Sequence, residues 1–221
     1  MNLDLRIYHS NEDQKIVDEY EKQLERQREE IAQRKYEQTG VPAKFYNETI
    51  DTYIAETPEE IKNKNIVVEF NKNPCNRVLI MCGNNGNGKT HLACSVLRDR
   101  DGLYITASDL CIEYESATSY NAKRTRQVLL RDMLEPELLV IDECRKYTLH
   151  PELEKFLLSY VGNARYENNK ATVYVTNDSK SGFVEFLGKS TFDRLTEVCT
   201  TLEFTGTSKR KGLRNDTSAA S

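Results

Sequence analysis

The chain has 221 residues, 38% of them hydrophobic, which is enough for one α/β domain with an appendage and too little for two full domains. A formal net charge of -4 gives no overall attraction to nucleic acid, so any DNA contact must come from local basic patches. No apolar stretch approaches membrane-spanning length and no secretory leader is visible, so we expect a cytoplasmic protein.

A long charged helix is predicted near the N-terminus, over residues 11–39. This segment is rich in Glu, Lys, Gln and Arg and contains neither Gly nor Pro, whereas Gly40 and Pro42 stop it. Its apolar residues form a stripe too thin for a globular core, consisting of Val17, Tyr20, Leu24 and Ile31. We therefore assign residues 1–40 to docking on a partner or to self-association, with a solvated helix lying on its own domain as the alternative.

A connecting segment is predicted over residues 41–65. Pro42 and Pro58 punctuate it, and its apolar side chains are expected to pack on the domain that follows. That domain, residues 66–212, contains the motifs described below, and residues 213–221 form a polar tail.

Residues 83–90 match the phosphate-binding pattern G-x-x-x-x-G-K-[ST] and directly follow the apolar run Val78 to Cys82. Glycines let backbone N–H groups converge on phosphate oxygens, Lys89 is expected to reach the β- and γ-phosphates, and the Thr90 hydroxyl is expected to bind Mg²⁺. A Gly- and Asn-rich surface turn is the alternative. The candidate nucleotide-binding residues are Gly83, Asn84, Asn85, Gly86, Asn87, Gly88, Lys89, Thr90 and His91. Of these, His91 is expected to pack rather than to catalyse.

Residues 137–143 are predicted to form an apolar strand that ends in two carboxylates, as the acidic partner of a phosphate loop requires. Asp142 is expected to hold the hydration shell of Mg²⁺. Glu143 is expected to orient and deprotonate the attacking water, which favours hydrolysis over mere nucleotide binding. A strand that simply ends in solvated acids is the alternative for this pair.

Extended and helical segments alternate through this part of the chain. Strands are predicted at residues 77–82, 102–106, 137–143, 171–176 and 200–204. Helices are predicted at residues 89–97, from 109, before 136, from 151, at 183–187 and at 191–197. This alternation predicts an α/β fold with a mostly parallel sheet between helices and with the phosphate loop at the carboxyl end of a strand.

Several of these segments together resemble one family of ATPases. They are Gly88-Lys89-Thr90-His91-Leu92-Ala93, Leu139-Val140-Ile141-Asp142-Glu143, Val175-Thr176-Asn177, Phe192-Asp193-Arg194-Leu195 and Gly206-Thr207-Ser208-Lys209-Arg210. Over residues 41–212 the chain resembles AAA+ ATPases of the DnaC-type helicase-loader and IstB-type transposition-helper group. The resemblance implies an AAA+ P-loop core without the C-terminal helical lid of many AAA+ proteins, since only a polar tail follows.

The resemblance also implies roles for three further residues. Asn177 resembles the sensor amide that hydrogen-bonds the γ-phosphate or the attacking water, with a plain turn residue as the alternative. Arg194 resembles the arginine finger that one subunit of a spiral or ring supplies to its neighbour's γ-phosphate, with a surface salt bridge as the alternative. Arg165 matches another family position, as either a second intersubunit arginine or a structural ion pair.

In this family, single-stranded DNA runs along the inner side of a spiral of ATPase subunits, against helices inserted after the second strand. The residues of that region suited to such a contact are Lys123, Arg124, Arg126, Tyr114 and Tyr120. The cations offer phosphate contacts and the rings offer stacking platforms, whereas a plain basic surface is the alternative. Residues 145–147 and 209–214 are two further basic candidates.

The leading hypothesis is an ATP-dependent replicative helicase loader acting in DNA replication. It would hydrolyse ATP with Mg²⁺, contact single-stranded DNA, and dock on a hexameric helicase through its N-terminal helix. The first alternative is an IstB-like transposition helper that selects target DNA and prefers a duplex. A small-molecule phosphotransferase is disfavoured by Asn177 and Arg194, and a non-hydrolysing adaptor by the intact pair Asp142 and Glu143.

Overall fold

The computed structural model describes residues 11–98, 100–117, 124–146, 149–206 and 208–209. Its centre is a sheet of five strands, which are β1 (Val78–Gly83), β2 (Gly102–Thr106), β3 (Leu138–Cys144), β4 (Ala171–Thr176) and β5 (Cys199–Phe204). The strands lie in the order β2-β3-β4-β1-β5, and every neighbouring pair is parallel. The prediction of a mostly parallel sheet is confirmed, and the described sheet is in fact parallel throughout.

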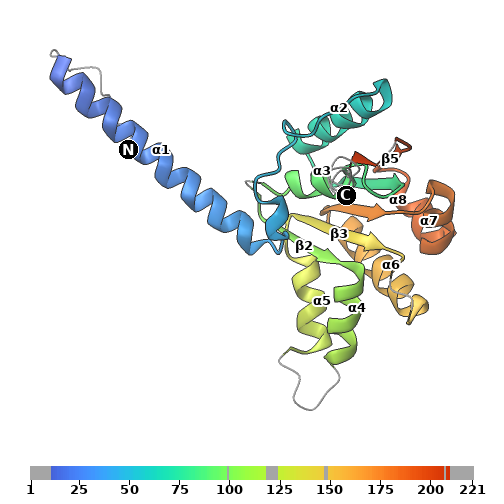
Figure 1. The fold of residues 1–221 in the computed structure, drawn as a ribbon. Helices are drawn as coiled ribbons and strands as arrows, with labels where there is room; N and C mark the ends of the chain where they lie inside the picture. The colour runs from blue at the N-terminus through green and yellow to red at the C-terminus, as the bar shows by residue number, and fades with distance from the viewer. Residues whose placement is uncertain (1–10, 99, 118–123, 147–148, 207, 210–221) are drawn as a thin grey trace, which may run out of the picture.

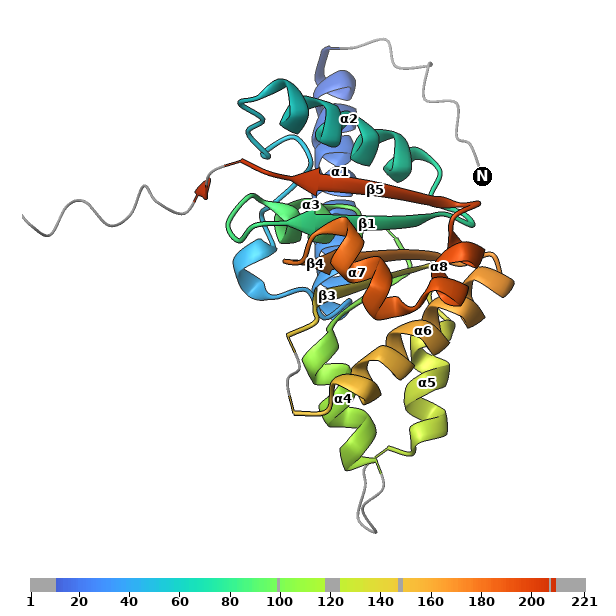
Figure 2. The same cartoon turned by 90° about the vertical axis from the view of Figure 1, so that its right-hand side faces the viewer.

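Helices cover both faces of the sheet (Figures 1 and 2). One face packs against α2 (Pro58–Lys72) and α3 (Lys89–Ser95). The other face packs against α4 (Ala107–Ser116), α5 (Arg126–Leu134), α6 (Pro151–Glu167), α7 (Lys180–Leu187) and α8 (Lys189–Leu195). Along β1, Leu79 and Met81 enter the first core while Ile80 and Cys82 enter the second, since side chains alternate across a strand. Burial on both faces explains why the central strands are almost continuously apolar.

The N-terminal helix α1 (Asn11–Gln38) is fixed to the core only at its C-terminal end and otherwise stands away from it (Figure 1). The Tyr36 hydroxyl donates to the Cys94 carbonyl oxygen at 3.1 Å, and Tyr104 N donates to Thr39 O at 2.7 Å. Further toward the N-terminus, Tyr20 is 58% exposed. Among the described residues, no helix is both long and apolar enough to span a membrane.

The segment predicted as a linker, residues 41–65, is only partly irregular. It includes a short 3-10 helix, η1 (Ala43–Phe45), and it then enters α2, which begins at Pro58 and crosses the predicted boundary at residue 65. Thr57 caps α2 in a reciprocal capping box with Glu60. Pro58 marks a helix start rather than an interruption, because proline at the first helical position loses no backbone hydrogen bond.

Arg165 takes neither of the two roles that the resemblance left open. Its side chain is fully buried, and its guanidinium donates to Met133 O at 2.8 Å, Ala171 O at 2.6 Å and Glu137 O at 3.2 Å. Burial lowers the pKa of Arg165 to about 10, so the group keeps its charge at neutral pH. Arg165 is therefore a structural residue that ties α5, α6, β3 and β4 together through carbonyl oxygens.

Candidate nucleotide-binding and hydrolysis site

The phosphate loop connects β1 to α3, at the carboxyl end of β1. Gly86 and Gly88 have φ angles of 86° and 81°, in the left-handed region that glycine tolerates. A Cβ atom at Gly86 would lie 2.1 Å from Ser208 Oγ, and one at Gly88 would lie 2.4 Å from a ring carbon of Tyr53. Both positions therefore require glycine for backbone conformation and for close approach. The alternative of a plain surface turn does not account for this packing.

Two predicted residues of the loop are fixed by hydrogen bonds. The side-chain amide of Asn87 is buried and donates to Phe204 O at 3.0 Å and to Gly206 O at 2.9 Å. Lys89 Nζ donates to Gly83 O at 2.7 Å and to Asn84 O at 2.6 Å, so the ammonium lies inside the curve of the loop. The loop is thus held in shape both by its own lysine and by the segment after β5.

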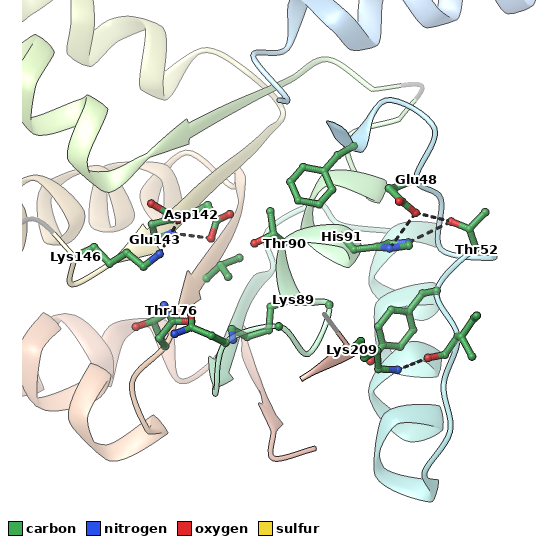
Figure 3. Close-up of a pocket in the computed structure, with 18 residues that line it drawn as sticks. Glu48, Thr52, Lys89, Thr90, His91, Asp142, Glu143, Lys146, Thr176 and Lys209 are labelled. Atoms are coloured by element: carbon green, nitrogen blue, oxygen red, sulfur yellow. Dashed lines mark hydrogen bonds and ion pairs between the residues drawn. The ribbon is translucent and has the colours of Figure 1, made fainter. Parts of the chain in front are cut away.

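The acidic pair lies at the end of β3, facing the loop (Figure 3). Asp142 is 3% exposed, and its two carboxylate oxygens accept hydrogen bonds from the Tyr104 hydroxyl at 2.9 Å and from Glu143 N at 2.6 Å. Burial, together with the Asp142 carboxylate, raises the pKa of Tyr104 far above its ordinary value, which keeps this hydroxyl a donor. Glu143 is partly exposed, and its Oε1 lies 2.7 Å from Lys146 Nζ.

These elements surround a cavity of about 370 Å³. It is lined by Phe45, Glu48, Thr52, Tyr53, Ile54, Asn85, Gly86, Gly88, Lys89, Thr90, His91, Asp142, Glu143, Lys146, Val175, Thr176, Asn177 and Lys209. Asn177 reaches the cavity because it directly follows β4, the neighbour of β1. The backbone oxygen of the next residue, Asp178, accepts a hydrogen bond from Gly83 N at 3.0 Å, and its carboxylate pairs with Arg145. These two contacts fix the segment after β4 against the phosphate loop and the end of β3. The cavity thus brings together the predicted phosphate loop, acidic pair and sensor.

One wall of this cavity comes from residues within 45–54 and from Lys209, none of which the sequence motifs had assigned to nucleotide binding. His91 fixes part of that wall, with Nε2 2.7 Å from Thr49 O and Nδ1 3.1 Å from Glu48 Oε2. The expectation that His91 packs rather than catalyses agrees with these contacts. The sequence signal for this wall was a set of aromatic residues between Pro42 and Pro58. These residues predicted packing on the following domain, but they did not predict that they would line the cavity.

Arg194 lies outside the cavity of its own chain. It belongs to α8, which leads into the amino end of β5, whereas the phosphate loop follows the carboxyl end of β1. Its side chain is 56% exposed and makes a 3.5 Å ion pair with Glu167, the last residue of α6. Such an exposed pair holds an arginine only weakly.

Of the basic residues predicted to meet DNA, Arg126 begins α5, and Arg124 lies two residues before that helix. Helices α4 and α5 lie side by side and project beyond the sheet (Figures 1 and 2). Arg124 pairs with Glu113 at 3.2 Å and also with Asp132. The Arg126 guanidinium lies 4.3 Å from the centre of the Tyr114 ring. Lys123 and Tyr120 fall outside the described residues.

The residues present fit a nucleoside triphosphate with Mg²⁺. Lys89 and the glycines of the loop offer a cation and close backbone approach to the phosphates. The Thr90 hydroxyl and the Asp142 carboxylate both line the cavity and are the oxygen ligands that Mg²⁺ prefers. The parallel sheet, the phosphate loop and the strand that ends in Asp142 and Glu143 together define a P-loop nucleotide-binding core of the AAA+ class.

Comparison with known proteins gives the family. The family model of IstB-like ATP binding proteins matches residues 10–217, and the chain belongs to that family. A replicative helicase loader DnaC from Buchnera aphidicola subsp. Baizongia pistaciae is 28% identical over 140 residues, which are 61% of this chain and 56% of the relative. The chain thus spans little more than half the length of that relative.

Solved structures share the fold. A DnaC helicase loader superposes with a TM-score of 0.65 and 22% identity, covering 74% of this chain and all of the other. The replication initiator DnaA bound to AMPPCP and single-stranded DNA gives a TM-score of 0.59 with 16% identity, covering 74% of this chain and 50% of that one. These likenesses confirm the AAA+ fold expected from the sequence.

Proposed function

We propose that the chain is an ATP-dependent replicative helicase loader acting in DNA replication. The observation that carries the proposal is α1, which extends from the ATPase core and leaves Ile16 and Tyr20 66% and 58% exposed. Apolar side chains on a helix that its own domain does not cover favour a protein partner. The printed name of the DnaC relative, a replicative helicase loader, supports a replicative helicase as that partner. We further propose that this helicase is hexameric and that the two proteins meet in the cytoplasm.

In the proposed reaction, ATP lies along the phosphate loop with Lys89 at its β- and γ-phosphates. Mg²⁺ held by Thr90 and Asp142 would neutralise charge that develops on the phosphate oxygens. Glu143 accepts the proton of the attacking water, after exchanging its contact with Lys146 for that water. Asn177 orients the γ-phosphate or the water with its amide. Loss of the γ-phosphate then removes the group that Lys89, Asn177 and the Arg194 of a neighbouring subunit contact together. The assembly of subunits loosens as a result.

Arg194 is proposed to complete the site of a neighbouring subunit in a homo-oligomeric spiral or ring. Its position at the opposite end of its own sheet supports a role in trans, and its exposed pair with Glu167 is readily exchanged for a phosphate. The site would therefore be active only after ATP or the helicase has brought subunits together.

Single-stranded DNA is proposed to bind along α4 and α5. Arg126 and the Tyr114 ring beside it combine a cation with a stacking surface, the two groups that such binding uses. Arg124 is the weaker candidate of the two, because it already bridges two carboxylates across these helices.

Helicase docking can be tested by co-purification with a hexameric replicative helicase. The double variant Ile16→Ser, Tyr20→Ser should reduce helicase retention by about tenfold or more, because it removes two exposed apolar anchors and no core contact. Ile61→Ser on α2 is the matched control, since this isoleucine is 49% exposed on the core and should leave retention unchanged. Equal retention by the double variant and the wild type would remove α1 as the docking element.

The same preparation separates the loader from a transposition helper. A loader should bind single-stranded oligonucleotides in preference to duplexes when both are titrated at fixed salt. Preference for a duplex, with no helicase retained, would favour the transposition helper instead.

A further inference from the structure

The segment after β5 lies across the phosphate loop. We name residues 205–206 and 208–209 the C-terminal strap. Its backbone bonds to the loop from two positions, with Gly206 O accepting from the Asn87 amide at 2.9 Å and Lys209 N donating to Gly86 O at 2.9 Å. The strap is therefore part of the wall around the loop and not a solvated extension of the strand.

The strap places one cation in the nucleotide cavity. Lys209 Nζ lies 3.2 Å from Glu60 Oε2 and 4.5 Å from the centre of the Tyr53 ring, and it also donates to Ile54 O. The Lys209 side chain is 25% exposed, while that of Glu60 is 8% exposed. The ammonium is therefore fixed by an almost buried carboxylate, with the aromatic ring beneath it. A free surface lysine has no such constraint.

Lys209 and the acidic pair lie on opposite sides of Lys89 (Figure 3). A triphosphate that extends along the loop toward Asp142 and Thr90 must direct its nucleoside the other way, toward Tyr53 and Lys209. Glu60 balances the charge of Lys209, so the ammonium is suited to donate a hydrogen bond to a sugar or base oxygen or nitrogen. It adds little net charge for binding phosphate.

We propose that Lys209 is a nucleotide-binding residue that donates a hydrogen bond to the ribose or base of the bound nucleotide. The inference rests on nucleotide binding by the phosphate loop, and it adds the strap as the element that recognises the nucleoside. Nucleotide binding and docking of the strap on the loop then favour each other. The reason is that the contact between Lys209 and the nucleotide exists only while the strap is docked.

The test compares the affinities of the full chain for ATP and for inorganic tripolyphosphate, both with Mg²⁺, by calorimetry. Lys209→Met keeps an unbranched stem over Tyr53 and removes the donor. It should weaken ATP binding about three- to tenfold, the cost of one hydrogen bond, and leave tripolyphosphate binding unchanged. The ratio of the two affinities is the readout, since a partly undocked strap lowers both equally. Lys209→Arg, which keeps a donor, should restore the ratio.

Lys72→Met is the matched control, because Lys72 also pairs with a glutamate at 2.6 Å but is 65% exposed and is not among the residues that line the cavity. An unchanged ATP affinity in Lys209→Met, or an equal loss for both ligands, would overturn the proposal. Lys89→Ala tests the premise separately, because it should abolish binding of both ligands. If it did not, the phosphate loop itself would be the wrong site, whatever Lys209 does.

Discussion

At the scale of single residues, the site combines one rigid carboxylate with one adjustable carboxylate. Asp142 is buried and bonded through both oxygens, so its position is set before any ligand arrives. Glu143 instead pairs with Lys146, and both side chains are more than 40% exposed, 45% and 42% respectively. Exposed pairs of this kind contribute little, so the Glu143 carboxylate can turn toward water at small cost.

Glu143→Gln should therefore separate binding from chemistry. We expect ATP affinity to stay within about twofold, since Lys89 and Asp142 remain, while turnover falls by about 10²- to 10⁴-fold because the amide cannot accept the proton. Titration with a fluorescent ATP analogue and a phosphate-release assay measure the two quantities. Turnover at the wild-type rate would exclude Glu143 as the base that activates water.

At the scale of elements, two polar residues join helices to other segments of the fold. Arg165 of α6 donates to carbonyl oxygens that belong to three other segments. Glu60 caps the N-terminus of α2 by accepting from Glu56 N at 2.7 Å, and it also pairs with Lys209 of the C-terminal strap. Both residues are fixed by tertiary contacts and not by helix propensity.

Arg165→Leu should destabilise the fold without touching the cavity. The change leaves two buried carbonyl oxygens, those of Met133 and Ala171, without this donor, and each costs about 1–3 kcal/mol. We therefore expect a loss of about 2 kcal/mol or more in the free energy of unfolding. Urea denaturation followed by circular dichroism measures it. A variant as stable as the wild type would show that these carbonyls find other donors.

Acidification should weaken the junction between α2 and the strap. Burial alone would raise the pKa of Glu60, but hydrogen bonds from Glu56 N and Lys209 outweigh it and leave the pKa below its ordinary value of 4.5. A carboxylate with a lowered pKa stabilises the fold fully above 4.5, and this contribution is lost as the pH falls through its pKa in the folded state.

The stability difference between the wild type and Glu60→Gln should therefore be largest near neutral pH and should shrink as the pH falls below 4.5. Denaturation midpoints measured for both proteins across this range give the difference directly. A difference that is constant with pH would mean that Glu60 acts through its shape rather than its charge.

At the scale of the whole molecule, the residues of the proposed site lie at two opposite ends of the sheet. The cavity lies at the carboxyl ends of β1, β3 and β4, whereas Arg194 precedes the amino end of β5. A chain with this arrangement cannot bring its own Arg194 to its own phosphate loop without rebuilding the sheet. Catalysis that uses both must therefore join two subunits.

Mixing two inactive variants tests this arrangement. Arg194→Ala subunits keep the ATP site and Lys89→Ala subunits keep the arginine, so a mixture should recover part of the wild-type ATPase rate while each variant alone is inactive. The rate is measured at concentrations that support assembly, with each pure variant as a control. A mixture as inactive as its components would contradict a finger that acts in trans.

Sequence patterns located the phosphate loop and the acidic pair of the candidate site because each is local in the chain. Residues 78–90 and 137–143 each combine an apolar strand with polar residues at fixed spacing, and these polar residues follow β1 or end β3, as the sequence predicted. Asn177 was placed by the family resemblance together with the end of its strand. Turn and helix signals were weaker guides, since Pro58 begins α2 instead of interrupting a linker.

The sequence by itself thus determined the alternating α/β fold, the phosphate loop and its acidic partner, because each depends on residues close together in the chain. The tertiary structure decided that Arg165 is structural, that residues 45–54 and Lys209 complete the cavity, and that Arg194 lies at the opposite end of the sheet. Those facts depend on contacts such as the one from Lys209 N to Gly86 O, between residues far apart in the sequence. Local periodicity in the sequence does not predict such contacts, because they form only when the sheet brings distant segments together.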